Sequence, residues 1–389
     1  MRILILSTTD LRKAAHSRPH QFVEYLSKRH EITAICINAW WLIGRRKNNL
    51  YNHEFNENVR IVYLTERKKS PALQEITSSI RFSYFMDSKY CNFDVYIDFD
   101  SIFSGYFLAK KIKQKRIPIV FDIDDDIPEM IKTSMNVPFP LKHIGGFVGK
   151  FFLEKNVRIA DKITYTLGSL RDSYNIPQIK SKFIPNGVDI QMFRSYPSEQ
   201  LREILGINQD LVIGYVGVLR EWVDLEPVFS AIRTLDIPLK LVIVGEEGRF
   251  KENEDLVKEY GISEKVLFVG TVPYSQVPKY ISIMDICLIP FKISPVTEHA
   301  LPLKLFEYMA CEKPVISTPL SGIKNTAGNL LFYASNAEDL KRIILELYHN
   351  DYLRFKFGKR GRKFVEENYS WDKICHDFEK VLIETVRNG

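Results

Sequence analysis

Short runs of apolar residues alternate with longer amphipathic stretches from one end of the chain to the other. In the first half, the apolar runs cover residues 3–6, 32–37, 59–64, 95–98, 117–123 and 162–166. Helical stretches, such as residues 20–29 and 103–115, lie between several of them. Buried strands separated by helices are typical of a parallel sheet that is covered on both faces. The pattern therefore predicts an α/β fold class.

The same rhythm begins again after a turn-rich region at 184–189 and a polar helical stretch near 199–205. The second set of apolar runs covers residues 212–216, 239–244, 266–269, 286–289 and 314–317. We therefore predict two doubly wound, Rossmann-like domains, the first over residues 1–195 and the second over residues 196–365. Residues 366–389 form a predicted C-terminal helix, with a break in the helical pattern at 368–370.

Composition and charge narrow the classes of partner. The chain has 389 residues, of which 45% are hydrophobic and 26% charged, and its net charge is +6. This mild positive charge suits an anionic ligand or an anionic membrane surface and does not indicate nucleic acid. The five cysteines are scattered without a C-x-x-C pair, which argues against a zinc site or a disulfide framework.

The start of the chain and the lengths of its apolar runs indicate where in the cell the protein is expected. Met1 and Arg2 lead directly into an apolar strand, without the pattern of a signal peptide. The longest apolar run, at 34–44, has about half of the roughly 20 residues that a membrane span needs. Scattered cysteines suit a reducing compartment. We expect a cytoplasmic protein, or one that is peripheral on the inner face of the membrane.

The segment from Pro302 to Glu307 carries the most specific chemistry. Pro302 is expected to open a helix, where its missing N–H costs nothing. The free N–H groups and positive dipole of a helix N-terminus favour a diphosphate, and Lys304 adds a cation. Glu307 lies one turn further on, where its carboxylate can accept two ribose hydroxyls. The alternative is an amphipathic helix with a solvated lysine and glutamate.

Glycine turns end several strands of the second half. Gly217 ends one apolar run, which lets a ligand approach the backbone, and Arg220 follows as a fixed positive charge. Gly245 ends the next run, and the run after it leads to Val272. Each such turn alone is common in α/β proteins. In this order and at this spacing, together with the 302–307 segment, they form a strong pattern.

This pattern resembles the donor site of GT-B glycosyltransferases of family 4, the glycosyl transferases group 1. The Pro302-x-Lys304-x-x-Glu307 segment is similar to a subgroup that lacks the family's usual first glutamate. That position falls on His299, with Glu298 beside it. The resemblance implies a set of donor-binding residues: Gly217, Arg220, Gly245, Val272, Glu298, His299, Leu303, Lys304 and Glu307.

The chain lacks two cationic side chains that common family members carry. Val218 and Val223 take the positions where those members carry an arginine and a lysine, and Arg220 with Lys304 is expected to restore the lost charge. The resemblance further implies two domains that face a cleft, a C-terminal helix that crosses back onto the first domain, and retention of anomeric configuration. It implies a nucleotide-diphosphate sugar as donor substrate, with no cofactor and no metal required.

The carboxylates after the run at 117–123 are the candidate catalytic groups. Family 4 enzymes often carry a His-Asp pair near the reacting sugar, and this chain has Asp124 and Asp125 there. Clustered carboxylates repel, so the pKa of at least one should rise, which suits proton handling on the acceptor. Magnesium binding and capping of the next helix are the alternatives that we weigh against acceptor or sugar contact.

Two further segments of the first half remain open. Arg18, before a helix, is a candidate contact to acceptor or phosphate, the alternative being solvation at a helix start. Residues 138–153 mix apolar and basic side chains. We favour a core helix with a glycine-rich beginning over an element at a membrane surface.

These observations predict a hexosyl-type glycosyltransferase of glycan, glycolipid or polysaccharide synthesis. Its expected partners are a nucleotide sugar, a glycan, lipid-linked or small-molecule acceptor and, as an open alternative, a membrane surface. Two rivals share the fold: a non-catalytic sugar- or nucleotide-binding relative and a nucleotide-sugar epimerase. A dinucleotide oxidoreductase is disfavoured because the first turn, Ser7 to Asp10, lacks the G-x-G-x-x-G pattern.

Overall fold

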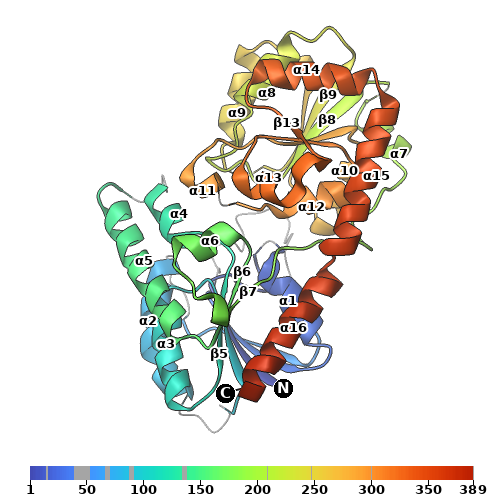
Figure 1. The fold of residues 1–389 in the computed structure, drawn as a ribbon. Helices are drawn as coiled ribbons and strands as arrows, with labels where there is room; N and C mark the ends of the chain where they lie inside the picture. Colours follow the sequence, from blue (N-terminus) through green and yellow to red (C-terminus); the bar gives the residue numbers. More distant parts are fainter. Residues whose placement is uncertain are drawn as a thin grey trace. The chain divides into compact units, whose positions relative to one another are not determined.

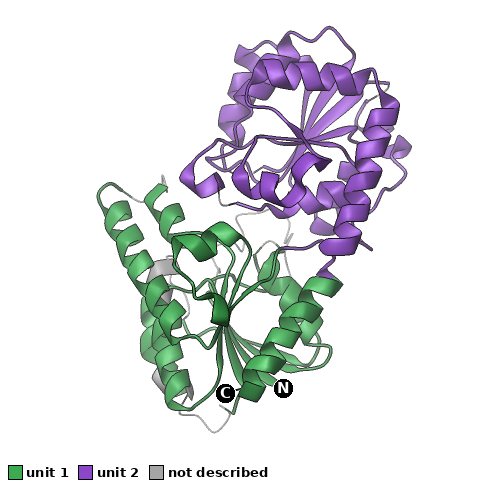
Figure 2. Ribbon diagram, viewed as in Figure 1, with its two compact units in different colours: residues 1–185, 372–389 green, residues 186–371 purple. Residues whose placement is uncertain are grey.

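The chain forms two compact units, which are described separately (Figure 2). Unit 1 consists of residues Met1–Pro185 and Asp372–Gly389, and unit 2 of residues Asn186–Trp371. The predicted first domain ends at residue 195, within unit 2. The computed structural model describes residues 1–14, 16–38, 53–65, 71–86, 92–133, 138–207, 209–246, 248–298 and 300–388.

Unit 1 is built on a seven-stranded sheet whose described pairings are all parallel. In spatial order its strands are β3 (Val59–Val62), β2 (Glu31–Cys36), β1 (Arg2–Ser7), β4 (Val95–Phe99), β5 (Ile119–Ile123), β6 (Lys162–Tyr165) and β7 (Ser181–Phe183). Every residue of β4 and β5 is buried, as expected for strands that are covered on both faces.

Helices cover both faces of this sheet (Figure 1). They are α1 (Arg18–Leu26), α2 (Pro71–Met86), α3 (Phe103–Gln114), α4 (Ile127–Thr133), α5 (Leu141–Ile159), α6 (Gly168–Ser173) and α16 (Trp371–Asn388). Helix α16 packs on α1, since the Phe378 ring lies 4.2 Å from that of Phe22. Glu379 accepts hydrogen bonds from Arg29 at 2.8 Å and His30 at 2.7 Å. The C-terminal helix is thus part of unit 1.

The expectation of a core helix at 138–153 is wrong for the outer face of α5. Gly146 and Gly149 are buried on its inner side, where a Cβ on Gly146 would lie 2.9 Å from the carbonyl oxygen of Pro128 in α4. The outer face is apolar yet open to solvent, at Leu141, Ile144, Phe147, Val148 and Phe151. Among the described residues, no helix has the length and apolar character to cross a membrane.

Unit 2 has a six-stranded parallel sheet. Its spatial order is β10 (Val266–Gly270), β9 (Leu239–Val244), β8 (Leu211–Val216), β11 (Ile286–Ile289), β12 (Val315–Ser317) and β13 (Phe332–Tyr333). Chain order runs outward in one direction from β8 to β10 and in the other from β11 to β13. The order therefore reverses between β8 and β11, and such a switch point at the carboxyl ends of the strands is where doubly wound sheets bind ligands.

Nine α-helices of unit 2 lie within the described residues. They are α7 (Glu199–Ile204), α8 (Glu226–Arg233), α9 (Phe250–Glu259), α10 (Val277–Ser282), α11 (Pro295–Glu298), α12 (Leu303–Ala310), α13 (Ser321–Ala327), α14 (Ala337–Tyr348) and α15 (Asp351–Asn368). Helices α8 and α14 lie side by side on one face of the sheet, and α12 packs against α15 on the other (Figure 1).

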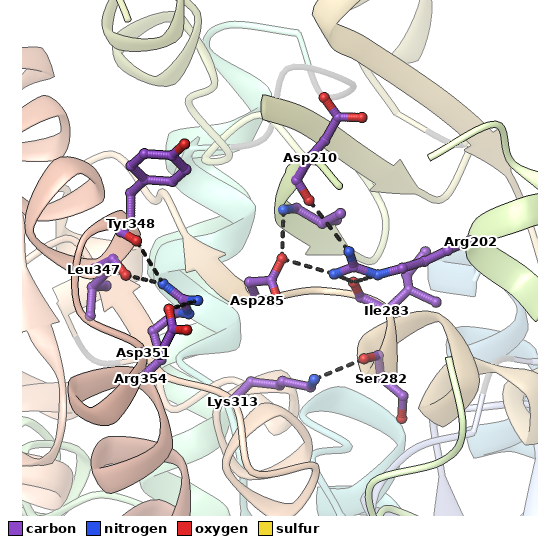
Figure 3. A network of polar contacts seen from close by, with 11 residues as sticks. Arg202, Asp210, Ser282, Ile283, Asp285, Lys313, Leu347, Tyr348, Asp351 and Arg354 are labelled. Carbon is purple, nitrogen blue, oxygen red and sulfur yellow. Dashed lines mark hydrogen bonds and ion pairs between the residues drawn. The ribbon is translucent and has the colours of Figure 1, made fainter. Parts of the chain in front are cut away.

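A polar network holds the amino ends of β8 and β11 together (Figure 3). Asp285 accepts hydrogen bonds from Arg202 and from the backbone N–H of Val212, both at 2.8 Å. Lys313 donates to the carbonyl of Ser282 at 2.8 Å. These charges are paired within the unit and lie at the edge opposite the carboxyl ends, so this network is a structural feature and not the candidate site.

Candidate functional site

Glycine turns bring three strand ends of unit 2 close together. Gly217 follows β8 with a φ of 132°, Gly245 follows β9 with a φ of 137°, and Gly270 ends β10 with a φ of 82°. A Cβ on Gly245 would lie 2.3 Å from the carbonyl oxygen of Gly217. The Gly245 N–H donates to the Gly270 carbonyl at 2.8 Å. Only glycine fits this crossing, and it leaves backbone exposed at the edge of the sheet.

Lys304 extends from the first turn of α12 over this glycine turn. Its Nζ donates to the Tyr215 hydroxyl at 2.6 Å, and that hydroxyl donates onward to the Val218 carbonyl at 3.0 Å. A Cβ on Gly217 would lie 2.7 Å from the same Nζ. The Lys304 ammonium is thus fixed above the backbone at the end of β8.

The Lys304 ammonium has no carboxylate partner within 4.0 Å in the described part of the chain. Desolvation lowers its pKa to about 7, and the nearby charge of Glu307 offsets part of this shift. A desolvated cation without a counter-ion is destabilised relative to one in water. An anion placed against Nζ would remove this deficit, so the geometry favours an anionic ligand.

Glu307 lies one turn further along α12 and is 8% exposed. Its Oε1 accepts a hydrogen bond from the Tyr274 hydroxyl at 3.0 Å. Desolvation raises its pKa to about 7, while the Tyr274 hydrogen bond and Lys304 act in the opposite direction. A carboxylate held in this way can accept hydrogen bonds from a pair of vicinal hydroxyls.

Three further predicted donor-binding residues come from α12 and from the segments after β8 and β10. Leu303 is the first residue of α12, Val272 is half-buried after β10, and Arg220 is exposed after β8. Pro302 is the residue before the helix, with an extended ψ of 136°. The helix therefore begins one residue later than predicted, because the proline keeps a strand-like backbone.

Glu298 and His299 are the two candidates for the position of the family's first glutamate. Glu298 ends the short helix α11, and its carboxylate accepts a hydrogen bond from the hydroxyl of Ser321 at the start of α13. This contact directs Glu298 toward α13. His299 lies outside the described residues.

A cavity of about 220 Å³ also opens at the carboxyl edge of unit 2. It is lined by the ends of β11 and β12, the loop after β13 and the start of α8, with Asp224, Lys292 and Ser317 among its polar groups. Of the predicted donor-binding residues that the structure describes, none lines it.

In unit 1, carboxylates gather at the carboxyl ends of β4 and β5. The Asp124 N–H donates to Asp100 Oδ1 at 3.0 Å. Desolvation raises the pKa of Asp100, and the negative charges of Asp124, Asp125 and Asp122 raise it further. Desolvation and the charges of Asp124 and Asp126 raise the pKa of Asp125 to about 7. The Asp125 side chain is exposed to solvent, so we expect water to reduce the rise in its pKa.

Helix capping, one of the alternatives for this acidic segment, belongs to another residue. Asp126 Oδ1 accepts a hydrogen bond from the Glu129 N–H at 3.1 Å in the first turn of α4, and another from the Tyr174 hydroxyl. Asp126 therefore caps α4, and this alternative does not apply to Asp124 or Asp125.

Arg18 is 1% exposed, which does not fit a contact with acceptor or phosphate. It forms a two-pronged ion pair with Asp122, at 2.8 and 2.9 Å. It also donates to the carbonyls of Ile184 and Pro185, both at 2.8 Å. A buried arginine with these partners ties α1 to β5 and to the chain after β7, which favours a structural role over ligand contact.

Three residues of these sites escape sequence reasoning. Tyr215 and Tyr274 hold Lys304 and Glu307, but tyrosines in apolar or turn segments carry no distinguishing signal. Asp100 follows β4 in the left-handed region, with a φ of 53°. Its position after an apolar run was the one available signal, and only the neighbouring placement of β4 and β5 brings it to Asp124.

Comparison with known proteins gives two concordant results. Residues 197–364 match the family model described as glycosyl transferases group 1. The uncharacterized glycosyltransferase MJ1178 of Methanocaldococcus jannaschii is 30% identical over 270 residues, which are 66% of this chain and 71% of that protein.

Solved structures share the fold over the whole chain. Sucrose-phosphate synthase from Thermosynechococcus elongatus matches with a TM-score of 0.79 and 17% identity, covering 100% of both chains. HepE from Anabaena, in complex with UDP, matches with a TM-score of 0.73 and 14% identity, covering 99% of this chain and 100% of its own.

Proposed function

Because the chain belongs to the glycosyl transferases group 1 and has the GT-B fold, we propose that it transfers a hexose from a nucleotide-diphosphate sugar to an acceptor hydroxyl. We assign it to family 4 and to the subgroup with the Pro302-x-Lys304-x-x-Glu307 segment. The reaction serves glycan, glycolipid or polysaccharide synthesis.

The observation that carries this proposal is the desolvated Lys304 ammonium above the Gly217 turn. A diphosphate at the N-terminus of α12 would accept hydrogen bonds from Nζ and from free N–H groups of the first helical turn. Arg220, exposed at the rim, adds a second cation. Charge grows on the diphosphate as the sugar departs, so preorganised positive groups stabilise the transition state more than the ground state.

Glu307 holds the ribose of the donor in this proposal. Its carboxylate lies one helical turn from Lys304 and is positioned by Tyr274, so one helix would bind both ribose and diphosphate. Gly217, Gly245 and Val272 supply the neighbouring backbone surface. HepE, which shares the fold, forms a complex with UDP, and this supports a nucleoside diphosphate as the ligand class.

The transfer proceeds with retention of configuration, as the family resemblance implies. The acceptor oxygen attacks the anomeric carbon on the face that the diphosphate leaves. The bond from that carbon to the phosphate oxygen breaks, and the leaving phosphate takes the acceptor's proton. Asp124 and Asp125 of unit 1 bind the acceptor hydroxyl or the sugar, and no metal or cofactor takes part in this chemistry.

The α5 face, defined as Leu141, Ile144, Phe147, Val148 and Phe151, supports a membrane-proximal acceptor. The exposed fractions of these side chains run from 41% to 73%, and contiguous exposed apolar surface marks interaction sites. Lys150 is exposed beside them, and Lys155 Nζ lies 5.1 Å from the Phe151 ring centroid. Apolar side chains flanked by lysines suit an anionic lipid surface. The protein then works in the cytoplasm, peripheral on the inner face of the membrane.

A thermal-shift screen with UDP, GDP, ADP, CDP and dTDP tests the donor site. A nucleotide that binds only the folded protein, at 100 times its dissociation constant, adds about 2.7 kcal/mol of stability. We expect one nucleotide to stabilise the wild type, not to stabilise Glu307→Ala, and to stabilise the control Glu346→Ala, which changes an exposed glutamate of α14.

Turnover of the matching nucleotide sugar then separates the rivals. We expect an acceptor-dependent release of nucleoside diphosphate. Stabilisation by no nucleotide would contradict the proposal in favour of a non-catalytic relative. An epimer formed without any acceptor would contradict it in favour of an epimerase.

A further inference from the structure

Three histidines and a glutamate converge in unit 1. His16 precedes α1, and His20 and Glu24 lie within it. His53 comes from the segment before β3, whose backbone is joined to this region by a hydrogen bond from the His53 N–H to the Arg12 carbonyl at 3.0 Å. The proposed function uses none of these side chains.

The donor atoms of three of them already face one another. His16, Glu24 and His53 each offer one ligand atom, and these atoms all lie within 4.8 Å of one another. His16 Nδ1 is 3.9 Å from Glu24 Oε1. Ligand atoms at about 2.1 Å from a tetrahedral zinc ion lie roughly 3.4 Å apart, so closing the cluster takes a shift of about an ångström. Glu24, whose side chain is 44% exposed, has room to make it.

The rings are oriented by their other nitrogens, as metal-binding histidines are. His53 Nε2 lies 3.0 Å from the Ala14 carbonyl, which can only accept, so Nε2 carries the proton and Nδ1 has the lone pair. His16 Nε2 lies 2.6 Å from the side-chain amide of Gln21. The contacting atom is the amide nitrogen, which donates, so binding of an ion through Nδ1 of His16, the atom beside Glu24, requires the Gln21 amide to turn its oxygen toward Nε2.

A third histidine ring packs against the cluster. His20 lies behind the cluster, with its ring centroid 5.1 Å from that of His16 and 4.4 Å from that of His53. Both nitrogens of His20 have partners, Nε2 with the Leu11 carbonyl and Nδ1 with Ser17, so this ring is a wall of the site and not a ligand.

We propose that His16, His53 and Glu24 form a binding site for a divalent ion of the zinc class. Two neutral imidazoles and one carboxylate are a donor set that zinc takes in proteins, with a fourth position left for water or another ligand. The ion joins the start of α1 to the segment before β3. The site lies in unit 1, and the donor residues lie in unit 2, so the two are tested independently.

Calorimetric titration of the chelator-treated, tag-free protein with Zn²⁺ tests this site. We expect one ion per chain with a dissociation constant in the micromolar range or below. Co²⁺ in its place should give visible absorption bands of tetrahedral intensity. His53→Gln and Glu24→Gln should each weaken binding at least tenfold, and the control His143→Gln, at an exposed histidine of α5, should not.

Binding of less than one ion per chain, or Zn²⁺ affinity unchanged in both ligand variants, would overturn the proposal. A melting curve of each variant without metal shows whether its fold is intact. Since Glu24 is half-exposed, Glu24→Gln is the variant least sensitive to misfolding. Nucleotide binding of both variants should match the wild type, whatever the outcome for zinc.

Discussion

At the scale of single residues, the contact between Gly217 and Lys304 is the most demanding feature. Gly217 has a φ of 132°, and a Cβ there would lie 2.7 Å from Nζ. Gly217→Ala should therefore displace the ammonium and strain the turn. We expect at least a tenfold loss of nucleoside diphosphate affinity, measured by calorimetry, and a fold destabilised by about 1–3 kcal/mol.

Gly206→Ala is the matched control for this variant. Gly206 also has a positive φ, of 67°, but an added Cβ would meet nothing within 4 Å. Gly206→Ala should strain the backbone and lower the stability of the fold as Gly217→Ala does, and it should leave nucleotide affinity unchanged. Equal affinities of the two variants would argue against a role for the Gly217 turn.

The affinity for a nucleoside diphosphate should peak near pH 7. The pKa of Lys304 is lowered to about 7, and an anion binds the protonated form, so affinity falls as pH rises above this value. The pKa of Glu307 is raised to about 7, and ribose hydroxyls donate to the ionised form, so affinity falls as pH drops below it. Calorimetry across this range should give a bell-shaped profile.

Two variants test which residue causes each limb of that profile. Lys304→Met should remove the alkaline limb and Glu307→Gln the acid limb. A wild-type profile that stays flat from about one unit below to one unit above neutrality would show that neither group titrates on binding.

The buried pair of Arg18 and Asp122 should matter for stability and not for ligands. Arg18→Met leaves Asp122, which is fully buried, without its counter-ion. Breaking a buried pair in this way costs about 3–5 kcal/mol, which urea denaturation would detect. A stable Arg18→Met protein with weakened acceptor or nucleotide binding would instead support the original expectation of ligand contact.

Residue roles were predictable where local spacing carries them. Lys304 and Glu307 lie on one helix and Gly217 on one turn, so their placement could be inferred from the sequence. Arg18 could not be, because its partner lies 104 residues away and burial follows from that pairing. Tyr274 meets Glu307 across 33 residues and was missed for the same reason.

At the scale of elements, the apolar runs predicted as strands all form strands. Those that were missed are short: β7 has three residues and β13 has two, too few for a hydrophobic pattern. The break before the last helix was predicted at 368–370, where α15 ends at Asn368 and α16 begins at Trp371. Ser370 bridges to Val188 there, so the break is fixed by a strand-like contact.

The outer face of α5 was misassigned because apolar residues lie on both sides of this helix. In the first half of α5 the buried residues are Gly146 and Gly149, so the bulky apolar side chains of that half lie outward. Periodicity alone does not distinguish a buried helix from one that carries a second apolar surface.

Vesicle sedimentation tests the role of the α5 face. Phe147 and Ile144 are 73% and 57% exposed, so Phe147→Glu and Ile144→Glu should fold normally. Each should weaken binding to vesicles rich in anionic lipid at least tenfold, since each replaces roughly 1.5–3 kcal/mol of apolar burial with a charge. Phe355→Glu, at a 61% exposed position of α15 in unit 2, is the control.

Two results would contradict the membrane assignment. Binding of all three variants equal to that of the wild type would remove the α5 face from any lipid contact. A wild-type dimer in solution that Phe147→Glu converts to a monomer would assign the same face to a second copy of the chain.

At the scale of the whole molecule, the two units divide the proposed chemistry. The residues assigned to the donor all belong to unit 2, which contains the matched range 197–364, and those assigned to the acceptor belong to unit 1. The motifs of unit 2 are the basis of its proposed ligand class. Unit 1 carries the unexpected features. The buried arginine and the histidine cluster arise from contacts between distant segments, and the exposed face of α5 arises from apolar residues on both sides of one helix.

The central claim is that Lys304 binds the diphosphate of a nucleotide donor. Its most direct test measures the affinity of a nucleoside and of its diphosphate for the wild type and for Lys304→Met. We expect the variant to lose about 1.5–3 kcal/mol of diphosphate affinity, the range for a hydrogen bond to a charged group, and to bind the nucleoside unchanged. Equal losses for both ligands, or no loss for either, would contradict the account.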